Sequence, residues 1–519
     1  MPNEPRAGAR HGAAALCALI GLAAGPVPAQ EPLSAIDWLS RSVATVPPPA
    51  PAAIAEPRVT RGAVPVEVAV TPLDGPSPDA AGLLPARRTG LPQDLWGMGR
   101  TTEIANRIAI APTGTLPALQ SLLSTLLLAE ADAPADSGGK GLLLLARVDK
   151  LLAMGALEGA ETLLDASGKG GAEVFRRQFD IALLTGTEDT ACEVMQKSPD
   201  LAPTFPARIF CLARSGDWNA AALTLRTAQA LGFVDDQQDA LLSRFLDPDL
   251  YEEDGPLPPP THVTPLIWRL MEAIGEPLPT QSLPIAFAHA ELRDTAGWKG
   301  QIEAAERLAR VGALEPNLLL GLYTERQAAA SGGVWERVRA FQTLDTALTA
   351  GDAVTVAQAL PEIWTLMAEA ELEVPFARLV AERLAALPLS SAAAELAFRI
   401  ALLDPDRAGA LPPYRPEDAT GRFLLALSEG RAAEAASVDG LSRAIAQAFR
   451  APVLSETTAT LLDQNRRGEA ILQAISEITG GLQGNPAAVT EGLSLLRKLG
   501  LEQVARRTGL ELLLLERRG

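Results

Sequence analysis

The chain contains three glycines, Gly155, Gly186 and Gly216, that lie 31 and 30 residues apart. Each is followed five positions later by an alanine: Ala160, Ala191 and Ala221. Large apolar residues also recur at fixed distances before and after each glycine. A period of this length is typical of stacked helical hairpins. We therefore expect at least three consecutive hairpins between about residues 141 and 231.

The third repeat shows how such a corner forms. Gly216 can adopt the left-handed backbone conformation that ends a first helix, and Asp217 can cap the start of a second. We expect Trp218 to fill the angle between these two helices. Ala221 is small, which lets the two helices of a hairpin approach each other closely.

The composition favours helices throughout. The chain is rich in alanine and leucine, which are strong helix formers. Aromatic residues make up only 4% of the sequence, and β-branched and aromatic residues are the ones that sheets prefer. The sequence therefore predicts an all-α fold, an α-solenoid of stacked helical hairpins.

Further corners indicate that the helical array continues to the C-terminus. Gly351, Gly430 and Gly500 lie 79 and 70 residues apart, which is about two repeats each. An acidic, proline-rich stretch at residues 247–265 interrupts the array, as long loops between compact units do. We expect it to separate a first lobe, residues 100–246, from a second lobe, residues 266–519.

The N-terminus has the features of a secretory signal peptide over residues 1–29. Arg6 and Arg10 precede an apolar stretch at residues 13–24, which is too short to span a bilayer. Small residues follow at a suitable cleavage position. The alternative is an uncleaved anchor. No later segment has about 18 uninterrupted apolar residues, so we expect a secreted protein of the bacterial periplasm with no transmembrane segment after cleavage.

Residues 30–99 are expected to lie outside the array. A short amphipathic piece around Trp38 is followed by a proline- and alanine-rich stretch, which is typical of a disordered linker. Within that stretch, the valines from Val64 to Val70 alternate with other residues as in a strand. This segment could dock on the solenoid itself or add as a strand to another protein. The alternative is a tether with an apolar patch.

The overall charge limits the class of partner. The formal net charge is −18 at pH 7, and no basic stripe is evident in the sequence. An acidic chain repels the phosphate backbone of nucleic acids. We therefore exclude nucleic acid as a partner.

Two resemblances follow from the corners. The pattern glycine-x-apolar-x-x-alanine, seen in Gly155–Ala160 and Gly216–Ala221, resembles tetratricopeptide-like repeats, although the period is about 30 residues rather than 34. Glu188 stands where the pattern has an apolar residue. The chain is also similar to the superhelical part of soluble lytic transglycosylases, but it lacks their lysozyme-like domain with its catalytic glutamate. The resemblance thus implies a secreted bacterial solenoid from which no activity carries over.

Cys192 and Cys211 are the two cysteines that remain after removal of the signal peptide. They fall on the second helix of one repeat and the first helix of the next, at similar distances from the intervening loop. Antiparallel packing would bring them together, and an oxidising compartment would allow a disulfide. The alternative is two buried free thiols. A redox-active pair is excluded because there is no C-x-x-C spacing.

Motifs for catalysis or cofactor binding are missing from the sequence. His262 and His289 are not accompanied by the spacings of a zinc site or by a serine-nucleophile elbow. The glycine-rich run Gly138–Gly141 does not have the phosphate-loop pattern. The acidic run Glu252–Asp254 reads as a solvated loop, not as a pair of glycosidase carboxylates. We therefore predict no catalytic residues, no metal and no cofactor.

A partner-binding groove is expected in the second lobe. Tryptophans there follow glycine-containing turns, and polar residues lie near them in the sequence. The candidate groove residues are Trp298, Tyr323, Arg326, Trp335, Arg337 and Arg339. The alternative is that the tryptophans pack at helix corners.

These features predict a non-catalytic secreted scaffold that mediates protein–protein interaction in the cell envelope. Its partner would be an unidentified envelope protein or peptide, and its oligomeric state stays open. One alternative is a protein related to cell-wall peptidoglycan hydrolases. Another is an envelope structural protein that self-associates through the leucines of its last helix, residues 501–517.

Overall fold

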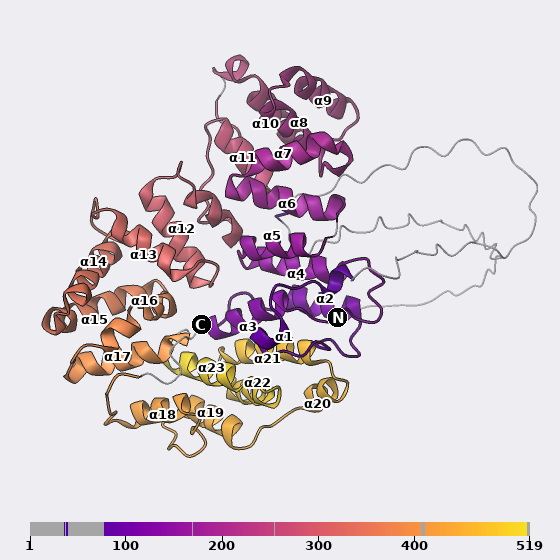
Figure 1. Ribbon diagram of the computed structural model, residues 1–519. Helices are drawn as coiled ribbons and strands as arrows, with labels where there is room; N and C mark the ends of the chain where they lie inside the picture. The colour runs from indigo at the N-terminus through magenta and orange to yellow at the C-terminus, as the bar shows by residue number, and fades with distance from the viewer. Residues whose placement is uncertain are drawn as a thin grey trace, which may run out of the picture. The chain divides into compact units, whose positions relative to one another are not determined.

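The structure is a computed structural model that describes residues 36, 38–39, 77–168, 170–253, 255–405 and 411–515. The expected signal peptide, the segment from Val64 to Val70 and most of the expected linker lie outside the described residues. The described chain is all-α, as the sequence predicted, and forms a solenoid of stacked helical hairpins (Figure 1). Among the described residues, no helix combines the length and apolarity needed to cross a membrane.

The elements up to residue 251 follow one another in short hairpins. They are η1 (Pro78–Ala80), α1 (Ala86–Thr89), α2 (Thr101–Ile110), α3 (Pro117–Leu128), α4 (Leu142–Ala153), α5 (Leu157–Ala166), α6 (Ala172–Thr185), α7 (Glu188–Lys197), η2 (Pro199–Leu201), α8 (Phe205–Arg214), α9 (Trp218–Ala230), α10 (Asp236–Leu246) and η3 (Pro248–Tyr251).

The elements from residue 265 onward are longer on average. They are α11 (Pro265–Ala273), η4 (Ile285–Leu292), α12 (Trp298–Arg310), α13 (Pro316–Glu325), α14 (Val334–Ala350), α15 (Ala353–Glu369), α16 (Glu373–Ala385), α17 (Ser391–Leu403), α18 (Ala419–Ser428), α19 (Gly440–Arg450), α20 (Glu456–Asp463), α21 (Arg467–Gly481), α22 (Pro486–Lys498) and α23 (Glu502–Leu514).

The repeated corners form as the sequence predicted. Gly155, Gly186 and Gly216 have φ of 77°, 82° and 86°, in the left-handed region that favours glycine. Each ends the first helix of a pair, α4–α5, α6–α7 or α8–α9, whose helices pack together. Ala160 and Ala221 are fully buried at the contact. The small side chain five positions after the glycine therefore sets how closely the two helices approach.

One detail of the expected corners differs. Asp217 caps α9 as expected, by accepting a hydrogen bond from the Ala220 amide at 3.0 Å, but Trp218 is 50% exposed and does not fill the angle. Its ring lies 6.2 Å from that of the half-buried Phe245, which in turn stacks on Phe210 at 5.7 Å.

Asn465 forms a corner that the glycine pattern missed. Its φ is 55°, and the alanine five positions later, Ala470, is fully buried. Asparagine tolerates the left-handed conformation better than most residues. Conversely, Gly430 ends α18 but is not followed by a helix, because irregular turns occupy residues 431–439.

The folded body begins earlier than the expected end of the linker at residue 99. From Ser77 onward the chain packs on α3 and α4, and a buried arginine fixes it there. Arg147 donates hydrogen bonds to the carbonyl oxygens of Leu127, Ala81 and Ala129 at 2.7, 2.7 and 2.9 Å. Burial lowers the pKa of Arg147 to about 10. Residues 77–99 thus belong to the solenoid.

The acidic stretch at residues 247–265 does not divide the chain into the two lobes expected from the sequence. One hydrophobic core runs from α6 to α11 and includes both Leu242, before the stretch, and Leu270, after it. A second core joins α2–α5 to the helices from η4 to α23. Apolar side chains pack by contact in space, and composition along the chain does not report those contacts.

The first helices of the array pack against the last ones (Figure 1). The amide of Gly468 donates to the Leu95 carbonyl oxygen at 2.8 Å. Beside this bond, the fully buried carboxylate of Glu469 accepts Arg107 at 3.0 Å and Arg466 at 2.6 Å. A buried carboxylate requires such partners because desolvation penalises its charge. The glutamate in α21 therefore joins α2 to the C-terminal part of the chain.

A second contact joins α3 to the last helix. The start of α3 has no side-chain cap of its own, and the carboxylate of Glu511, in α23, accepts the Ala118 amide at 2.9 Å. A carboxylate at a helix N-terminus is favoured by the unpaired amides and by the helix dipole. Leu512 and Leu515 are buried, so part of the leucine run proposed for self-association packs within the chain itself.

Replacing the buried carboxylate tests the importance of this contact. We expect Glu469→Gln to lower the free energy of unfolding by about 2–4 kcal/mol, because it leaves two guanidinium groups without their shared partner. The matched control is Glu103→Gln: Glu103 also pairs with Arg466, at 2.9 Å, but is 52% exposed. Exposed pairs contribute about 0–1 kcal/mol. Chemical denaturation followed by circular dichroism would measure both, and equal losses would contradict the assignment.

Candidate interaction site

The two tryptophans of the predicted groove pack on each other. The rings of Trp298 and Trp335 lie 4.9 Å apart at a tilt of 48°. The Trp298 indole donates to the Leu322 carbonyl oxygen at 3.1 Å. Both side chains are half-buried. This is the corner packing that the sequence left open as the alternative.

Tyr323 and Arg337 also make contacts within the protein, so their assignment as partner contacts is wrong. Tyr323 is fully buried, and its hydroxyl donates to Glu306 at 2.7 Å. Arg337 binds the same carboxylate through two nitrogens, at 2.8 and 2.5 Å. Burial, followed by the charge of Glu306, raises the pKa of Tyr323 well above its ordinary value. The three side chains connect α12, α13 and α14.

Arg326 and Arg339 are exposed, and each has a local partner. Arg326 pairs with the neighbouring Glu325 at 2.8 Å, and Arg339 donates to the Ala330 carbonyl oxygen at 3.0 Å. The structure therefore brings the two tryptophans, Tyr323 and Arg337 together as a packed junction between helices. The two exposed arginines stay at the surface.

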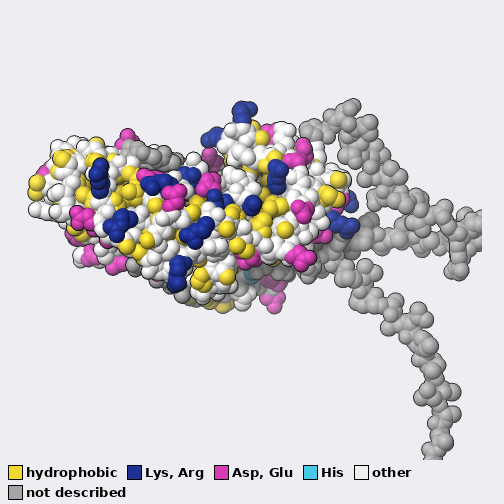
Figure 2. Space-filling model, turned by 90° about the horizontal axis from the view of Figure 1, so that it is seen from below, with side chains coloured by type: hydrophobic (Ala, Val, Ile, Leu, Met, Phe, Trp, Pro, Cys, Tyr) yellow, Lys and Arg dark blue, Asp and Glu magenta, His cyan; other side chains and the backbone are white. Residues whose placement is uncertain are grey.

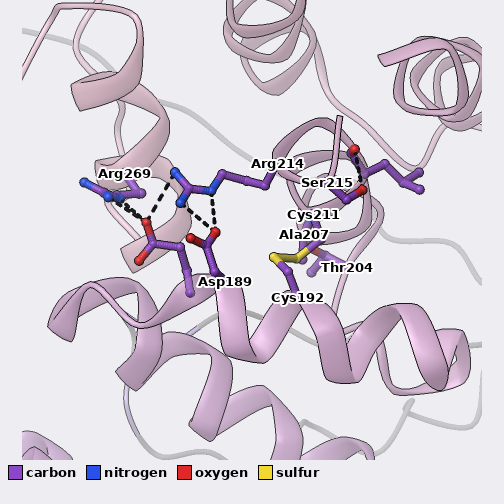
Figure 3. The surroundings of a disulfide bond; sticks show 10 residues. Asp189, Cys192, Thr204, Ala207, Cys211, Arg214, Ser215 and Arg269 are labelled. Atoms are coloured by element: carbon purple, nitrogen blue, oxygen red, sulfur yellow. Dashed lines mark hydrogen bonds and ion pairs between the residues drawn. A yellow bond between two sulfur atoms is a disulfide. The ribbon is translucent and has the colours of Figure 1, made fainter. Parts of the chain in front are cut away.

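The structure joins Cys192 and Cys211, the two cysteines that the sequence analysis paired (Figure 3). Their Cα atoms lie 5.1 Å apart, and the bridge connects α7 to α8. Both residues are buried in the core that runs from α6 to α11. The bridge therefore crosses from the second hairpin to the third.

Glu188, which departs from the repeat pattern, is the centre of an ion-pair network. Figure 3 shows Arg214 and Arg269, its two basic partners. Its carboxylate is buried in α7 and accepts two hydrogen bonds from Arg269, at 3.1 and 2.6 Å. Arg214 approaches the same oxygen at 3.6 Å. Because Arg269 lies in α11, the network fixes that helix against the second repeat. An apolar residue at this position could not hold α11 in this way.

The same core carries a groove of about 1030 Å³, which we call the α10–α11 groove. It lies between α8, α10, α11 and the proline-rich segment 257–264. Its lining is mostly apolar: Pro206, Phe233, Leu241, Leu257, Leu266, Ile267 and Met271 contribute to it. Pockets with apolar walls and a few polar groups are the usual binding sites of proteins.

The proline-rich segment is held as one wall of the groove. Arg244 donates to the Gly255 carbonyl oxygen at 2.7 Å and pairs with Glu276 at 3.0 Å. The Glu276 carboxylate also accepts the Leu257 amide at 2.9 Å. The sequence indicated a loop here but not a groove. The feature of the sequence that could have indicated a groove is the amphipathic helix α11, which begins directly after the prolines.

The charged side chains that line the α10–α11 groove are all acidic. Asp235 and Asp236 line it at the start of α10, and none of its lining residues is a lysine or arginine. His262 also lines the groove. On the face shown in Figure 2, acidic, basic and hydrophobic side chains are interspersed. The lining of the groove differs in that it includes acidic but no basic side chains.

Large apolar side chains are also exposed on elements next to the same core. Five of the large hydrophobic residues that are exposed in the described chain lie between positions 194 and 250: Val194, Trp218, Leu223, Leu231 and Leu250. They belong to α7, α9 with its C-terminal residue, and η3. Single exposed apolar residues are ordinary on protein surfaces, so the groove itself carries the evidence for an interaction surface.

The other histidine has a structural role. His289 is half-buried in η4, and its Nε2 lies 2.7 Å from the Gly155 carbonyl oxygen. Burial lowers the pKa of His289, so the ring is neutral at pH 7 and donates to that oxygen. Over the described ranges, the structure has no group of three or more His, Cys, Asp or Glu residues that could hold a metal ion.

Comparisons with known proteins give no relative from which a site could be transferred. No family profile, curated protein or solved structure matches the chain. The α10–α11 groove therefore defines the candidate site by geometry and chemistry alone.

The disulfide should contribute to stability. Its cysteines are 19 residues apart, and closing a loop of that size restricts the unfolded chain by about 3 kcal/mol. We expect the Cys192→Ala/Cys211→Ala variant to unfold at a lower denaturant concentration by a corresponding amount. Reductant should lower the midpoint of the parent protein and leave that of the variant unchanged. An equal response of both proteins would show that the bridge is not the cause.

Proposed function

We propose that the chain is a non-catalytic helical-repeat scaffold that binds a protein partner in the cell envelope, and that the partner occupies the α10–α11 groove. The observation that carries this proposal is an open groove of about 1030 Å³ whose walls are mostly apolar and whose lining includes acidic but no basic side chains. Stacked hairpins provide extended surfaces of this kind without a catalytic centre. The protein would act by holding a partner, with no bond made or broken.

The groove favours a particular type of segment. Apolar side chains of the partner would replace water on walls formed by residues such as Ile267 and Met271. Asp235 and Asp236 favour lysine or arginine beside those apolar residues. The volume is sufficient for several side chains. We therefore propose an apolar, basic segment of an envelope protein as the ligand.

The location in the envelope is supported by two independent features. Residues 1–29 have the pattern of a signal peptide, and the structure joins Cys192 to Cys211. Disulfides persist mainly in oxidising compartments such as the bacterial periplasm. Export would therefore let this bridge form.

A charge placed in the groove tests the proposal. Ile267 is half-buried and lines the groove, so Ile267→Asp should abolish capture of the partner, because a carboxylate would be desolvated against apolar side chains. The control is Val354→Asp, which adds the same charge at a site 69% exposed on α15. Crosslinked pull-down from the envelope fraction, quantified by mass spectrometry, would compare both variants with the parent protein.

The expected result is a set of proteins captured by the parent and by Val354→Asp, and lost with Ile267→Asp. Capture should also weaken as salt is raised, because acidic groups contribute to it. A folded Ile267→Asp variant that captures the same proteins would contradict the groove as the binding site. Release of muropeptides from purified peptidoglycan would contradict a non-catalytic function and favour the hydrolase alternative.

A further inference from the structure

A second cavity lies where the two ends of the helical array meet. It has a volume of about 1100 Å³, and we call it the junction cavity. Its lining comes from the start of α3, the end of α12, the corner between α15 and α16, α17, and the ends of α21 and α23. At its edge the hydroxyls of Thr115 and Thr479 are hydrogen-bonded at 2.6 Å. The cavity thus exists only when segments far apart in the sequence are in place.

A buried amide in the junction cavity is incompletely satisfied. Gln120, in α3, lines the cavity and is 6% exposed. Its Nε2 donates to the Thr113 carbonyl oxygen at 3.2 Å, which orients the amide. Its Oε1 has no hydrogen-bond partner among the described residues. A buried acceptor without a donor is costly, so a ligand that supplies a donor would be favoured there.

The charged residues of the junction cavity are of both signs. Arg310 and Arg399 line it together with Glu369, Glu371 and Glu373. Arg310 donates to the Ala370 carbonyl oxygen at 2.9 Å. Two basic and three acidic side chains offset most of each other's field, so neither a strongly anionic nor a strongly cationic ligand is selected.

Trp364 adds an aromatic wall to the junction cavity. It is half-buried and packs near Phe376, with ring centroids 6.4 Å apart. A tryptophan combines a large apolar surface with one N–H donor. Together with Gln120, the arginines and the glutamates, it offers donors, acceptors and an apolar wall in one place.

We propose that the junction cavity binds a neutral polyhydroxylated ligand, a short saccharide. Each hydroxyl can both donate and accept a hydrogen bond, which matches a lining that contains amide, carboxylate and guanidinium groups. A hydroxyl would satisfy Gln120 Oε1 once the Gln120 side chain turns that buried oxygen toward the cavity, and the C–H face of the sugar ring would pack on Trp364. A ligand without net charge is favoured because the lining carries charges of both signs and only a small excess of acidic groups. The site is separate from the α10–α11 groove and does not depend on the function proposed for it.

Titration calorimetry on the full mature chain tests this proposal. The probes are maltotriose, cellotriose and tri-N-acetylglucosamine, each at concentrations up to about 10 mM, which covers weak binding. We expect at least one of them to bind. Gln120→Leu and Trp364→Ala should each weaken that binding about tenfold or more, because one removes the buried acceptor and the other the aromatic wall. The control is Gln301→Leu, which removes an amide from α12 that donates to Arg293.

A second measurement covers the case of a variant that folds poorly. Because both ends of the array form the junction cavity, a bound sugar should raise the unfolding temperature of the parent protein and of Gln301→Leu. It should not raise that of Gln120→Leu. The Ile267→Asp variant should keep sugar binding, which separates this test from that of the groove.

Three results would overturn the proposal. The first is that none of the three saccharides binds or raises the unfolding temperature. The second is that binding is unchanged in folded Gln120→Leu and Trp364→Ala. The third is that a charged compound of similar size, such as trilysine or citrate, binds at this site more tightly than the neutral sugars.

Discussion

The contact between the two ends of the helical array is the constraint on which the closed arrangement depends, and a buried carboxylate lies in it. Glu469 lies in α21 and binds Arg107 of α2, while the backbone of Gly468 pairs with that of Leu95. Without this contact the first and last helices would each expose an apolar side. The junction cavity and the core that joins the early helices to those after η4 both contain residues from the two ends.

Local features of the fold could be predicted from the sequence. The left-handed glycines and buried alanines, such as Gly216 and Ala221, act within one hairpin, so their spacing identifies the corners. The pairing of Cys192 with Cys211 also followed from positions on adjacent helices. The corner at Asn465 was not predicted, because an asparagine there adopts the left-handed conformation that glycine adopts at the other corners. These successes and this omission share one cause, which is that a corner is encoded over a few residues.

Features that join distant segments could not be predicted. Glu188 appeared to be an exception in the repeat, and only the packing of α11 brings Arg269 to it. The sequence suggested that Tyr323 and Arg337 are available to a partner, but in the structure both side chains bind the Glu306 carboxylate. The α10–α11 groove likewise needs the segment 257–264 to be held by Arg244. Each depends on the mutual arrangement of helices, which the hydrophobic periodicity of a single helix does not specify.

The joining of the array's ends has a consequence for how this chain acquires its structure. Hairpins such as α8–α9 involve short sequence separations and can form as soon as their residues are available. In contrast, Ala118 is 393 positions from Glu511, its partner, so α3 must wait for the end of the polypeptide to be synthesised. Until then its N-terminal amides and apolar side remain exposed to chaperones and proteases. Truncation near the C-terminus would therefore damage the beginning of the array as well.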